Sequence, residues 1–279
     1  MKTKIMGILN ITPDSFSDGG LYMDVDAAVK HAAQMMQEGA DSIDVGGEST
    51  RPGAESVSVK EEIDRVVPVI RSIRRALGDT FPISIDTYKA EVANEALAAG
   101  ATMVNSMGGL TFDPSLGEVV AKASCPFIIY HILGVPRTMQ QGEIVYDDVV
   151  AAVRTFFEEQ IIKGKAVGIK KEQFIVDPGI GFGKTVDHNL TLIRHISDFA
   201  SLGLPILVGV SRKSHLGTIL KDAFDLPEPP PPGERLEAAL AETAIAVLGG
   251  SSIIRTHDVA ATKKCVATVE AIMNKGGQV

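Results

Sequence analysis

Eight runs of apolar, β-prone residues alternate along this 279-residue chain with longer segments of helical periodicity. Each run is continuously apolar, which is typical of parallel strands that are covered on both faces. Eight strand–helix cycles predict an α/β fold, a single (β/α)8 barrel in one domain that takes in residues 1–279. The predicted strands are Ile5–Leu9, Ser42–Val45, Ile83–Ile85, Met103–Val104, Phe127–Tyr130, Phe174–Val176, Ile206–Val210 and Ser252–Arg255.

Several of the helical segments between the strands end at a glycine. Gly39, Gly78, Gly100 and Gly249 follow four of them, and a helix C-terminus favours a residue that tolerates positive φ. The alternative fold, an open parallel sheet, needs a glycine-rich phosphate loop after the first strand, where residues 10–13 read NITP. The predicted helices are Val25–Glu38, Lys60–Leu77, Ala90–Ala99, Ser115–Ala123, Asp147–Lys165, Val186–Phe199, Arg235–Leu248 and Val259–Asn274.

The charge balance and composition limit the classes of partner. A net charge of -8 and a pI of about 5.3 argue against a nucleic-acid surface and against binding to anionic membranes. No apolar run reaches the length of a membrane span, and the N-terminus does not resemble a signal peptide, so we expect a cytoplasmic protein. Cys125 and Cys265 lack metal-ligand spacing and are expected to be reduced. The proline-rich stretch Pro227–Gly233 predicts a stiff spacer before the next helix.

Six short segments place polar or charged residues where a predicted strand ends. Active sites of (β/α)8 barrels lie at the carboxyl ends of the strands, so the six segments together indicate an enzyme. Two of them include long polar loops, Thr12–Gly20 and Gly46–Ala54, which are either lids or disordered ornament. The segments are NITPDSFSDGG at 10–20, DVGGESTRPGA at 44–54, SIDTYK at 84–89, DPGIGFGKT at 177–185, GVSRKS at 209–214 and IIRTHD at 253–258.

Two of these segments carry an aspartate at the end of a strand. Asp86 either projects into the barrel mouth or caps the following helix, with Thr87 as the other capping candidate. Asp177 is either part of a simple turn signal or a carboxylate that binds a ligand. Three glycines around Phe182 allow the backbone to approach a planar ligand closely, so this loop suits a flat, hydrogen-bonding heterocycle.

The last strand ends in two basic side chains, Arg255 and His257, which are two residues apart and therefore share one face. With Asn10 from the adjacent first strand they predict an anion site, at the usual phosphate position of these barrels. The alternative is a structural pair of Arg255 with Asp258. Lys213, after the seventh strand, is also predicted to contact the ligand.

Taken together, the six segments resemble the dihydropteroate synthases, and they occur in the expected order from the first strand to the last helix. The resemblance implies condensation of 6-hydroxymethyl-7,8-dihydropterin pyrophosphate with p-aminobenzoate, giving 7,8-dihydropteroate and pyrophosphate. It also implies a dissociative mechanism, in which pyrophosphate leaves before the aniline nitrogen attacks. A homodimer formed through barrel helices in the 235–274 region is a further implication.

The resemblance assigns a role to each candidate site residue. Asp177 accepts the 2-amino group and N3–H of the pterin, Asn105 and Asp86 read the rest of the ring, and Lys213 its carbonyl side, as buried donors and acceptors require. Asn10, Arg255 and His257 hold the pyrophosphate, and Asn10 contributes to a Mg2+ site. Asp86 stabilises the cationic methylene, and Arg255 and His257 stabilise the departing charge. Phe182 flanks the pterin, and the p-aminobenzoate pocket is formed by Ser15, Thr50, Arg51, Pro52, Phe182 and Ser214.

The chain departs from the usual family pattern near the pterin floor and the p-aminobenzoate pocket. The departures are Ser106 after Asn105, Tyr130 and Ile132 around His131, and His215 after Ser214. They are expected to alter affinity or sulfonamide sensitivity while the principal polar ligands remain. Two alternatives stay open: a related pterin-binding barrel that transfers a methyl group from methyltetrahydrofolate to a corrinoid protein, and a non-catalytic pterin-binding homologue.

Overall fold

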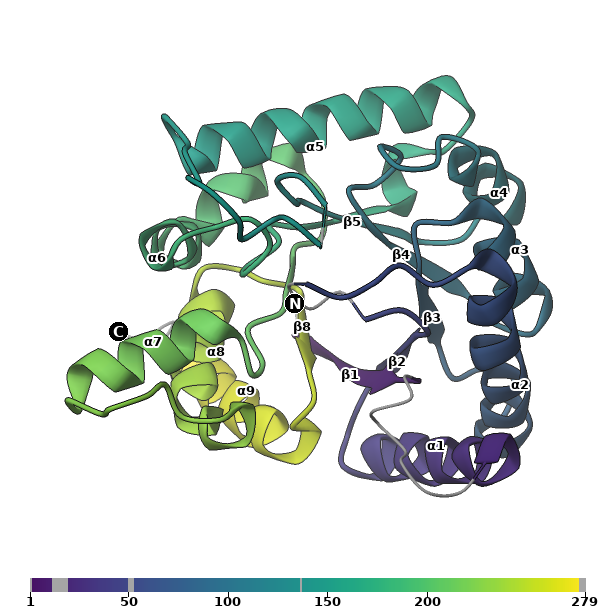
Figure 1. Cartoon of the computed structure of the whole chain (residues 1–279), viewed down its shortest axis with the longest axis horizontal. Coiled ribbons are helices and arrows are strands. Elements are labelled where there is room, and N and C mark those ends of the chain that lie inside the picture. Colours follow the sequence, from purple (N-terminus) through teal and green to yellow (C-terminus); the bar gives the residue numbers. More distant parts are fainter. Residues whose placement is uncertain (1, 12–19, 50–52, 136, 276–279) are drawn as a thin grey trace.

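The computed structural model describes residues 2–11, 20–49, 53–135 and 137–275 of the chain. Within these ranges, eight parallel strands form one sheet in the order β6-β5-β4-β3-β2-β1-β8-β7. A parallel bridge between Val176 and Ile206 joins the two ends of the sheet, so the strands form a nearly closed barrel (Figure 1). The predicted (β/α)8 barrel is confirmed. The strands are β1 (Lys4–Asn10), β2 (Ser42–Gly46), β3 (Ile83–Asp86), β4 (Met103–Met107), β5 (Phe127–Tyr130), β6 (Phe174–Asp177), β7 (Leu207–Val208) and β8 (Ile253–Thr256).

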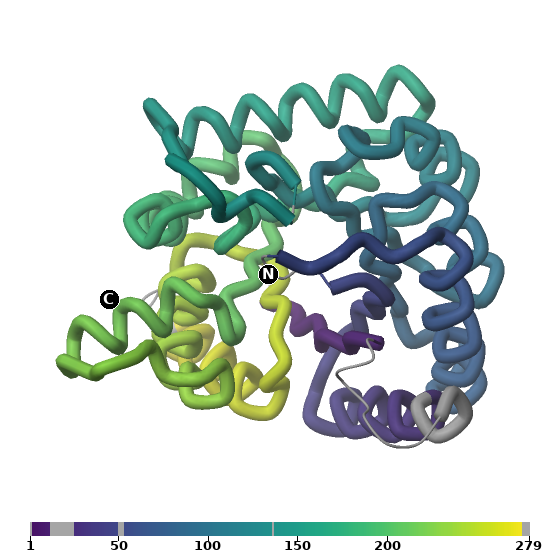
Figure 2. Tube along the Cα trace, in the orientation of Figure 1, coloured from purple at the N-terminus to yellow at the C-terminus, as the bar shows by residue number. Residues whose placement is uncertain are grey.

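The helices lie outside the strands and connect each strand to the next. Figure 2 shows the chain passing once around the barrel, so that the purple first strand lies beside the yellow last one, and β1 pairs with β8 from Lys4 and Ile253 onwards. In the described part of the chain, no helix is both long and apolar enough to cross a membrane. The helices are α1 (Gly20–Gln37), α2 (Val59–Leu77), α3 (Ala90–Ala98), α4 (Leu116–Ala123), α5 (Val149–Ala166), α6 (Val186–Arg194), α7 (Ser214–Ala223), α8 (Leu236–Leu248) and α9 (Val259–Lys275), with 3-10 turns η2 (Lys171–Gln173), η3 (Ile196–Leu202) and η4 (Pro232–Glu234).

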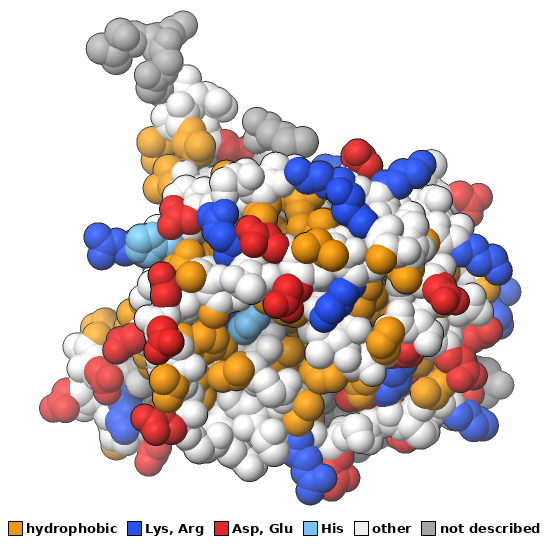
Figure 3. Space-filling model, turned by 90° about the horizontal axis from the view of Figure 1, so that it is seen from above, with side chains coloured by type: hydrophobic (Ala, Val, Ile, Leu, Met, Phe, Trp, Pro, Cys, Tyr) orange, Lys and Arg blue, Asp and Glu red, His pale blue; other side chains and the backbone are white. Residues whose placement is uncertain are grey.

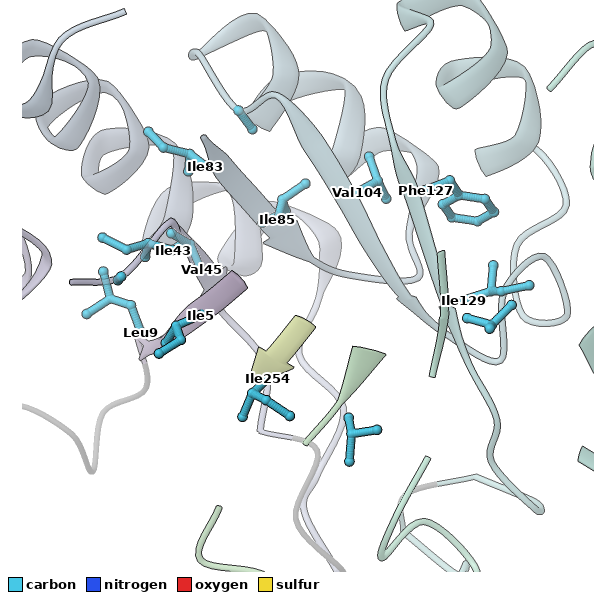
Figure 4. Close-up of a cluster of buried hydrophobic side chains, with 14 of the residues drawn as sticks. Ile5, Leu9, Ile43, Val45, Ile83, Ile85, Val104, Phe127, Ile129 and Ile254 are labelled. Carbon is cyan, nitrogen blue, oxygen red and sulfur yellow. The ribbon is translucent and has the colours of Figure 1, made fainter. Parts of the chain in front are cut away.

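The core has two layers, because successive strand residues point to opposite faces of the sheet. The outer layer packs strand side chains such as Ile43 and Val45 against the helices (Figure 4). The inner layer fills the barrel and consists of the buried residues Met6, Ile128, Ile175, Leu207 and Ile253. Asp44, between Ile43 and Val45, therefore belongs to the inner face, and the same alternation places Asp86 of β3, Asp177 of β6 and Arg255 of β8 there.

The predicted elements differ from the observed ones mainly at their ends. The predicted strand Ile206–Val210 is reduced to two residues, and the predicted helix Val186–Phe199 ends at Arg194, because His195 leaves the helical region (φ -106°, ψ 22°) and a 3-10 turn takes over. Residues 224–231 connect α7 to η4 without a helix, as expected for a spacer.

Three of the four predicted helix-ending glycines are confirmed. Gly39, Gly78 and Gly100 have φ of 103°, 83° and 113°. The prediction was wrong at Gly249, which keeps a helical φ of -73° and donates to Ile245. The left-handed residue is Gly250, with φ of 94°, so the chain turns one position later than the sequence pattern suggested.

Candidate active site

Strand ends from around the barrel bring polar side chains together at its mouth. The register places Asp86 beside both Gly46 and Asn105, and Tyr130 beside Asp177. A Cβ at Gly46 would lie 3.6 Å from Cβ of Asp86 and 3.7 Å from Oδ1 of Asn10, so this glycine leaves space between the two side chains. Of the predicted site residues, the structure brings together Asp86, Asn105, Asp177, Phe182, Lys213 and Arg255 by direct contact or through shared neighbours, with Asn10 and His257 at the adjacent strand ends.

Arg255 is the centre of an ion-pair network across the mouth. Its Nε lies 2.7 Å from Oδ2 of Asp44, and its Nη2 lies 2.8 Å from Oδ2 of Asp86. The alternative pairing with Asp258 was wrong, because that carboxylate pairs with Arg212 at 2.8 Å. Asp44 was missed by the sequence analysis, although a charged residue inside an otherwise apolar buried strand was a usable signal.

Asp86 shares one guanidinium with a second carboxylate. Burial and the negative charge of Asp44 raise the pKa of Asp86 to about 7, against the opposing effects of Arg255 and of the Tyr130 hydroxyl, which donates to Oδ1 at 3.2 Å. Asp86 does not cap α3: the residue at that position is Lys89, whose amide donates to Oγ1 of Thr87. The carboxylate of Asp86 is therefore available in the barrel mouth, with a pKa well above that of an ordinary aspartate.

Asn105 extends this network and brings to it an acceptor oxygen without a partner. Its Nδ2 donates to Oδ2 of Asp44 at 2.8 Å. Its own Oδ1 is buried, and so are Oδ1 of Asp44 and the hydroxyl of Ser84, and none of the three has a hydrogen-bond partner among the residues that the structure describes. Buried oxygens of this kind require donors from a ligand or from water.

Asp177 ends β6 and begins the loop that connects this strand to α6. Burial raises its pKa to about 6, against the Gly179 amide, which donates to Oδ1 at 2.7 Å, and the positive charges of Lys213 and Arg255. Gly179 is required here for two reasons: its φ is 69°, and a Cβ would lie 1.8 Å from the carbonyl oxygen of His131. The loop thus presses against the end of β5.

Phe182 lies between an aromatic ring and a cation. Its ring centroid is 5.1 Å from that of Tyr130, and Nζ of Lys213 lies 3.9 Å from the Phe182 centroid, within cation–π range. Burial and the charge of Arg255 lower the pKa of Lys213 to about 8, although Asp177 and Asp86 oppose this shift. An apolar ring and a half-buried cation beside a carboxylate suit a flat ring with both donors and a carbonyl.

The turn before α7 holds Lys213 in place. Arg212 adopts φ of 60°, which is unusual for a residue other than glycine. Nη1 of Arg235 donates to the carbonyls of Arg212 and Lys213 at 3.1 and 3.3 Å. Ser214, predicted to line the p-aminobenzoate pocket, is the first residue of α7 and is exposed.

His257 is neutral rather than cationic. Burial and the charges of Arg212 and Arg255 lower its pKa to about 3, and its Nδ1 lies 3.0 Å from the hydroxyl of Ser211. In the ligand-free site, the imidazole can therefore offer an anion a hydrogen bond but no charge. Ser211 was not singled out in the sequence analysis.

Four predicted residues, Ser15, Thr50, Arg51 and Pro52, lie outside the described residues. Glu48 lies in the described part of the loop Gly46–Ala54, and it is anchored there because Glu48 and the buried Glu62 both accept from Nζ of Lys89. Beside it is a cavity of about 410 Å³ whose lining includes Tyr88, Met107 and Phe112. In the described ranges, no group of three or more His, Cys, Asp and Glu side chains could hold a metal ion.

The departures from the family pattern occupy different surroundings. Tyr130 takes part in the site through Asp86, whereas the hydroxyl of Ser106 donates to the carbonyl of Gly109. His215 is buried against Glu242 of α8, with Nε2 2.9 Å from Oε1. Ile132 is half-buried after the end of β5.

Comparisons with known proteins find similar sequences and similar structures. The model of the pterin binding enzyme family matches residues 6–257. A dihydropteroate synthase of Synechocystis is 46% identical over 271 residues, 97% of this chain and 90% of the relative. The structure of a dihydropteroate synthase from Clostridium difficile, determined in the presence of pteroic acid, has a TM-score of 0.88 and 42% identity, and covers 97% of both chains. A dihydropteroate synthase from Xanthomonas albilineans with 4-aminobenzoic acid has a TM-score of 0.86 and 40% identity, and covers 98% of this chain and 93% of its own.

Proposed function

The chain belongs to the dihydropteroate synthase family of pterin-binding enzymes, and we propose that it catalyses the reaction of that family. In this reaction, 6-hydroxymethyl-7,8-dihydropterin pyrophosphate and p-aminobenzoate give 7,8-dihydropteroate and pyrophosphate. The observation that carries the proposal is the group of buried acceptors at the barrel mouth: the carboxylate of Asp177 and the unpartnered oxygens of Asp44 and Asn105. A pterin offers ring and amino N–H donors of the kind that such acceptors require.

Pterin recognition is assigned to the loop after β6 and to the ends of β3 and β4. Ionised Asp177 accepts the 2-amino group and N3–H as a bidentate pair, which is a strong, charge-assisted arrangement. Asn105 and Asp86 contact the rest of the ring, Lys213 donates to its carbonyl side, and Phe182 covers its face. The contact between Lys213 and Phe182 supports this grouping, since one ligand ring can meet both.

The pyrophosphate end is assigned to Asn10, Arg255 and His257. Arg255 uses Nε and Nη2 for the two aspartates, which leaves Nη1 to donate to an anion. His257 donates from Nε2 while Nδ1 faces Ser211. Both contacts stabilise negative charge on the departing group.

A magnesium ion fits this site only together with the substrate. Asn10 supplies an amide oxygen at the end of β1, close to the space left by Gly46. Mg2+ commonly binds through few protein oxygens, with phosphate oxygens and water completing its shell. We therefore assign Asn10 as a protein ligand, and the bound ion neutralises pyrophosphate charge.

The reaction is proposed to be dissociative. The C–O bond between the pterin methylene and pyrophosphate breaks, and its electron pair leaves with pyrophosphate. The neutral aniline nitrogen then forms a C–N bond with the cationic methylene carbon and loses a proton to solvent. Asp86 stabilises the cation, and the p-aminobenzoate pocket is assigned to Phe182 and Ser214 together with Ser15, Thr50, Arg51 and Pro52.

Small molecules are the proposed partners, in the cytoplasm, with a second copy of the chain as dimer partner. On the face in Figure 3, basic and acidic side chains are interspersed, which supports small-molecule rather than nucleic-acid binding. Exposed apolar residues on α8 and α9, namely Ile245, Leu248, Ile272 and Met273, support a dimer through these helices.

The test is pyrophosphate release from purified protein with the pterin pyrophosphate and Mg2+, with and without p-aminobenzoate, combined with detection of 7,8-dihydropteroate. We expect release coupled to product formation, and its loss in Asp86→Asn. Asp222→Asn, an exposed carboxylate on α7, is the matched control and keeps full activity. Pterin binding without product in the wild type would overturn the proposal in favour of a binding homologue, and methyl transfer from methyltetrahydrofolate would favour the other barrel class.

A further inference from the structure

Lys184 is a buried lysine in the loop between β6 and α6, only 3% exposed, and the proposed reaction gives it no role. Its Nζ lies 2.9 Å from Nδ1 of His131, 3.0 Å from the carbonyl oxygen of Gly179 and 3.0 Å from that of Phe182. An ammonium group has three hydrogens, so these acceptors use all of them. Because all of its hydrogens are used, the ammonium group holds the side chain in a fixed position. We call this group of contacts the Lys184 joint.

The joint connects two strand ends that meet at the pterin site. Gly179 and Phe182 belong to the loop that begins at Asp177, and His131 directly follows β5. The backbone N–H of His131 also donates to the carbonyl of Asp177 at 3.1 Å. Side-chain and backbone bonds therefore both fix the Asp177 loop to the end of β5.

His131 serves this joint as a neutral acceptor. Burial and the charge of Lys184 lower the pKa of His131 to about 2, so its ring carries one proton. Since Nδ1 accepts from Lys184, the proton belongs on Nε2. The ring packs against Phe156 with centroids 5.1 Å apart, edge to face, which holds it in this orientation.

The charge of Lys184 has no carboxylate in contact among the described residues. Asp177 nonetheless acts on it at longer range: its negative charge favours the charged lysine, and the lysine in turn lowers the pKa of Asp177. Two buried charges of opposite sign in a poorly solvated site stabilise each other's ionised forms. A ligand that removes water from Asp177 makes this support more important.

We propose that Lys184 is a positioning residue for pterin recognition, which fixes the loop carrying Asp177 and Phe182 and keeps Asp177 ionised beneath the bound ring. The inference rests on the proposed function, since it concerns how the pterin-reading carboxylate is held. It assigns Lys184 no contact with the substrate.

The groups that face this joint determine its pH dependence. They are His131 after β5, Asp177 from β6, Lys213 before α7, and Tyr146 and His188, whose contacts reach Gly183 and Thr185 on either side of Lys184. Burial lowers the pKa of Lys184 to about 7, with Asp177 opposing the shift. Pterin affinity is therefore expected to fall as the pH rises through about 7, because the lysine loses its charge, and also as the pH falls below about 6, because Asp177 is protonated.

The experiment measures binding of 6-hydroxymethylpterin by calorimetry between pH 5 and 9. This probe lacks pyrophosphate and so reports the ring site without Mg2+ or turnover. Lys184→Met keeps most of the unbranched side chain and removes its charge and donors, and we expect roughly 10- to 100-fold weaker binding at pH 7. The low-pH midpoint should move upward, since Asp177 loses a stabilising charge. The decline near pH 7 should disappear, which leaves only the decline near pH 8 that deprotonation of Lys213 causes. Lys122→Met on α4, an exposed lysine, is the control and should match the wild type.

The outcomes distinguish a structural role of Lys184, a role of its charge, and the existence of the pterin site itself. An unchanged pH profile in a folded Lys184→Met protein, whether or not affinity falls, would overturn the charge role. A failure of that variant to fold leaves the wild-type profile as the test, and constant affinity from pH 6 to 9 would contradict the inference. His131→Asn, which retains an acceptor, should bind more tightly than His131→Phe. A wild type that does not bind the probe at all would instead refute the pterin site itself.

Discussion

Two groups of three charged side chains, each buried or half-buried, face each other across the barrel mouth, and they are organised differently. The acidic half consists of Asp44, Asp86 and Arg255, in which one guanidinium contacts both carboxylates at 2.7 and 2.8 Å. The basic half consists of Asp177, Lys184 and Lys213, and among the described residues it contains no ion pair within contact distance. With every group ionised, the acidic half carries a net charge of minus one and the basic half plus one.

The difference shows that ion pairs in contact and charges that act at longer range have separate roles in one site. Direct pairs in the acidic half hold its shape before any ligand binds, and removal of the shared cation leaves two buried carboxylates. In the basic half, burial shifts the pKa values of Asp177, Lys184 and Lys213 to about 6, 7 and 8, because no oppositely charged group in contact offsets desolvation. The acidic half should therefore govern stability, and the basic half, together with Asp86, should govern how binding depends on pH.

The largest effect is expected from Arg255→Met. Removing one partner of a buried ion pair typically costs about 3–5 kcal/mol, and here two carboxylates lose the same cation. We expect a loss of this size in the free energy of unfolding, measured by urea denaturation at pH 8, together with loss of turnover. The deficit should be smaller at pH 5, because Asp86, whose pKa is raised on folding, binds a proton in the native state and the fold gains stability as the pH falls.

A double variant sharpens this prediction. Asp44→Asn added to Arg255→Met removes one of the stranded charges, so it should recover part of the lost stability without recovering turnover. A loss below about 1 kcal/mol in Arg255→Met would contradict the comparison, since a pair that weak is typical of solvent-exposed sites.

An intermediate effect, on activity alone, is expected from Lys213→Met. A lysine whose pKa is lowered on folding is more costly to keep charged in the native state, so its removal should leave stability at pH 7 unchanged or higher. The lost charge-assisted contact is worth about 1.5–3 kcal/mol, so kcat/KM should fall roughly 10- to 150-fold. In the wild type, kcat/KM should decline as the pH rises through about 8, because this parameter reports the free enzyme.

The control is Lys221→Met in the last turn of α7, outside the site, which should keep both stability and the pH profile. A clear loss of stability in Lys213→Met would show that the basic half is also held by its charges, and the distinction between the halves would fail.

The sequence predicted the barrel and much of the site, because the signals for both lie within single strands and their ends. Strands buried on both faces read as apolar runs, and a polar residue such as Asp86 or Asp177 at the end of a run projects from the inner face by simple alternation. The partners of Arg255 could not be derived in this way. Asp44 is 211 residues away, and the contact exists only because β8 returns beside β1 when the barrel closes.

Other features that the sequence analysis missed concern the surroundings of a residue rather than its place in the fold. Lys184 was visible in the DPGIGFGKT segment, but its three acceptors come from the folded loop and from β5, so the residue gave no sign of being buried. His257 was predicted to join an anion site as a basic residue, yet burial beside two arginines makes it neutral. Burial and long-range charge are properties of the closed barrel, and no spacing rule expresses them.

The smallest effect is expected from Arg212→Gln, which tests whether burial or pairing sets these energies. Nη2 of Arg212 lies 2.8 Å from Oδ1 of Asp258, the same distance as in one Arg255 pair, but the side chains of Arg212 and Asp258 are 42% and 25% exposed. Exposed pairs are screened by solvent, so the free energy of unfolding should change by less than about 1 kcal/mol in urea denaturation at low and at high salt. Arg212→Gly gives a second reading at the same position: φ of 60° suits glycine, so this variant should be no less stable than Arg212→Gln. A loss from Arg212→Gln that approaches that of Arg255→Met would mean that the pairing geometry, and not desolvation of the two aspartates, makes the acidic half rigid.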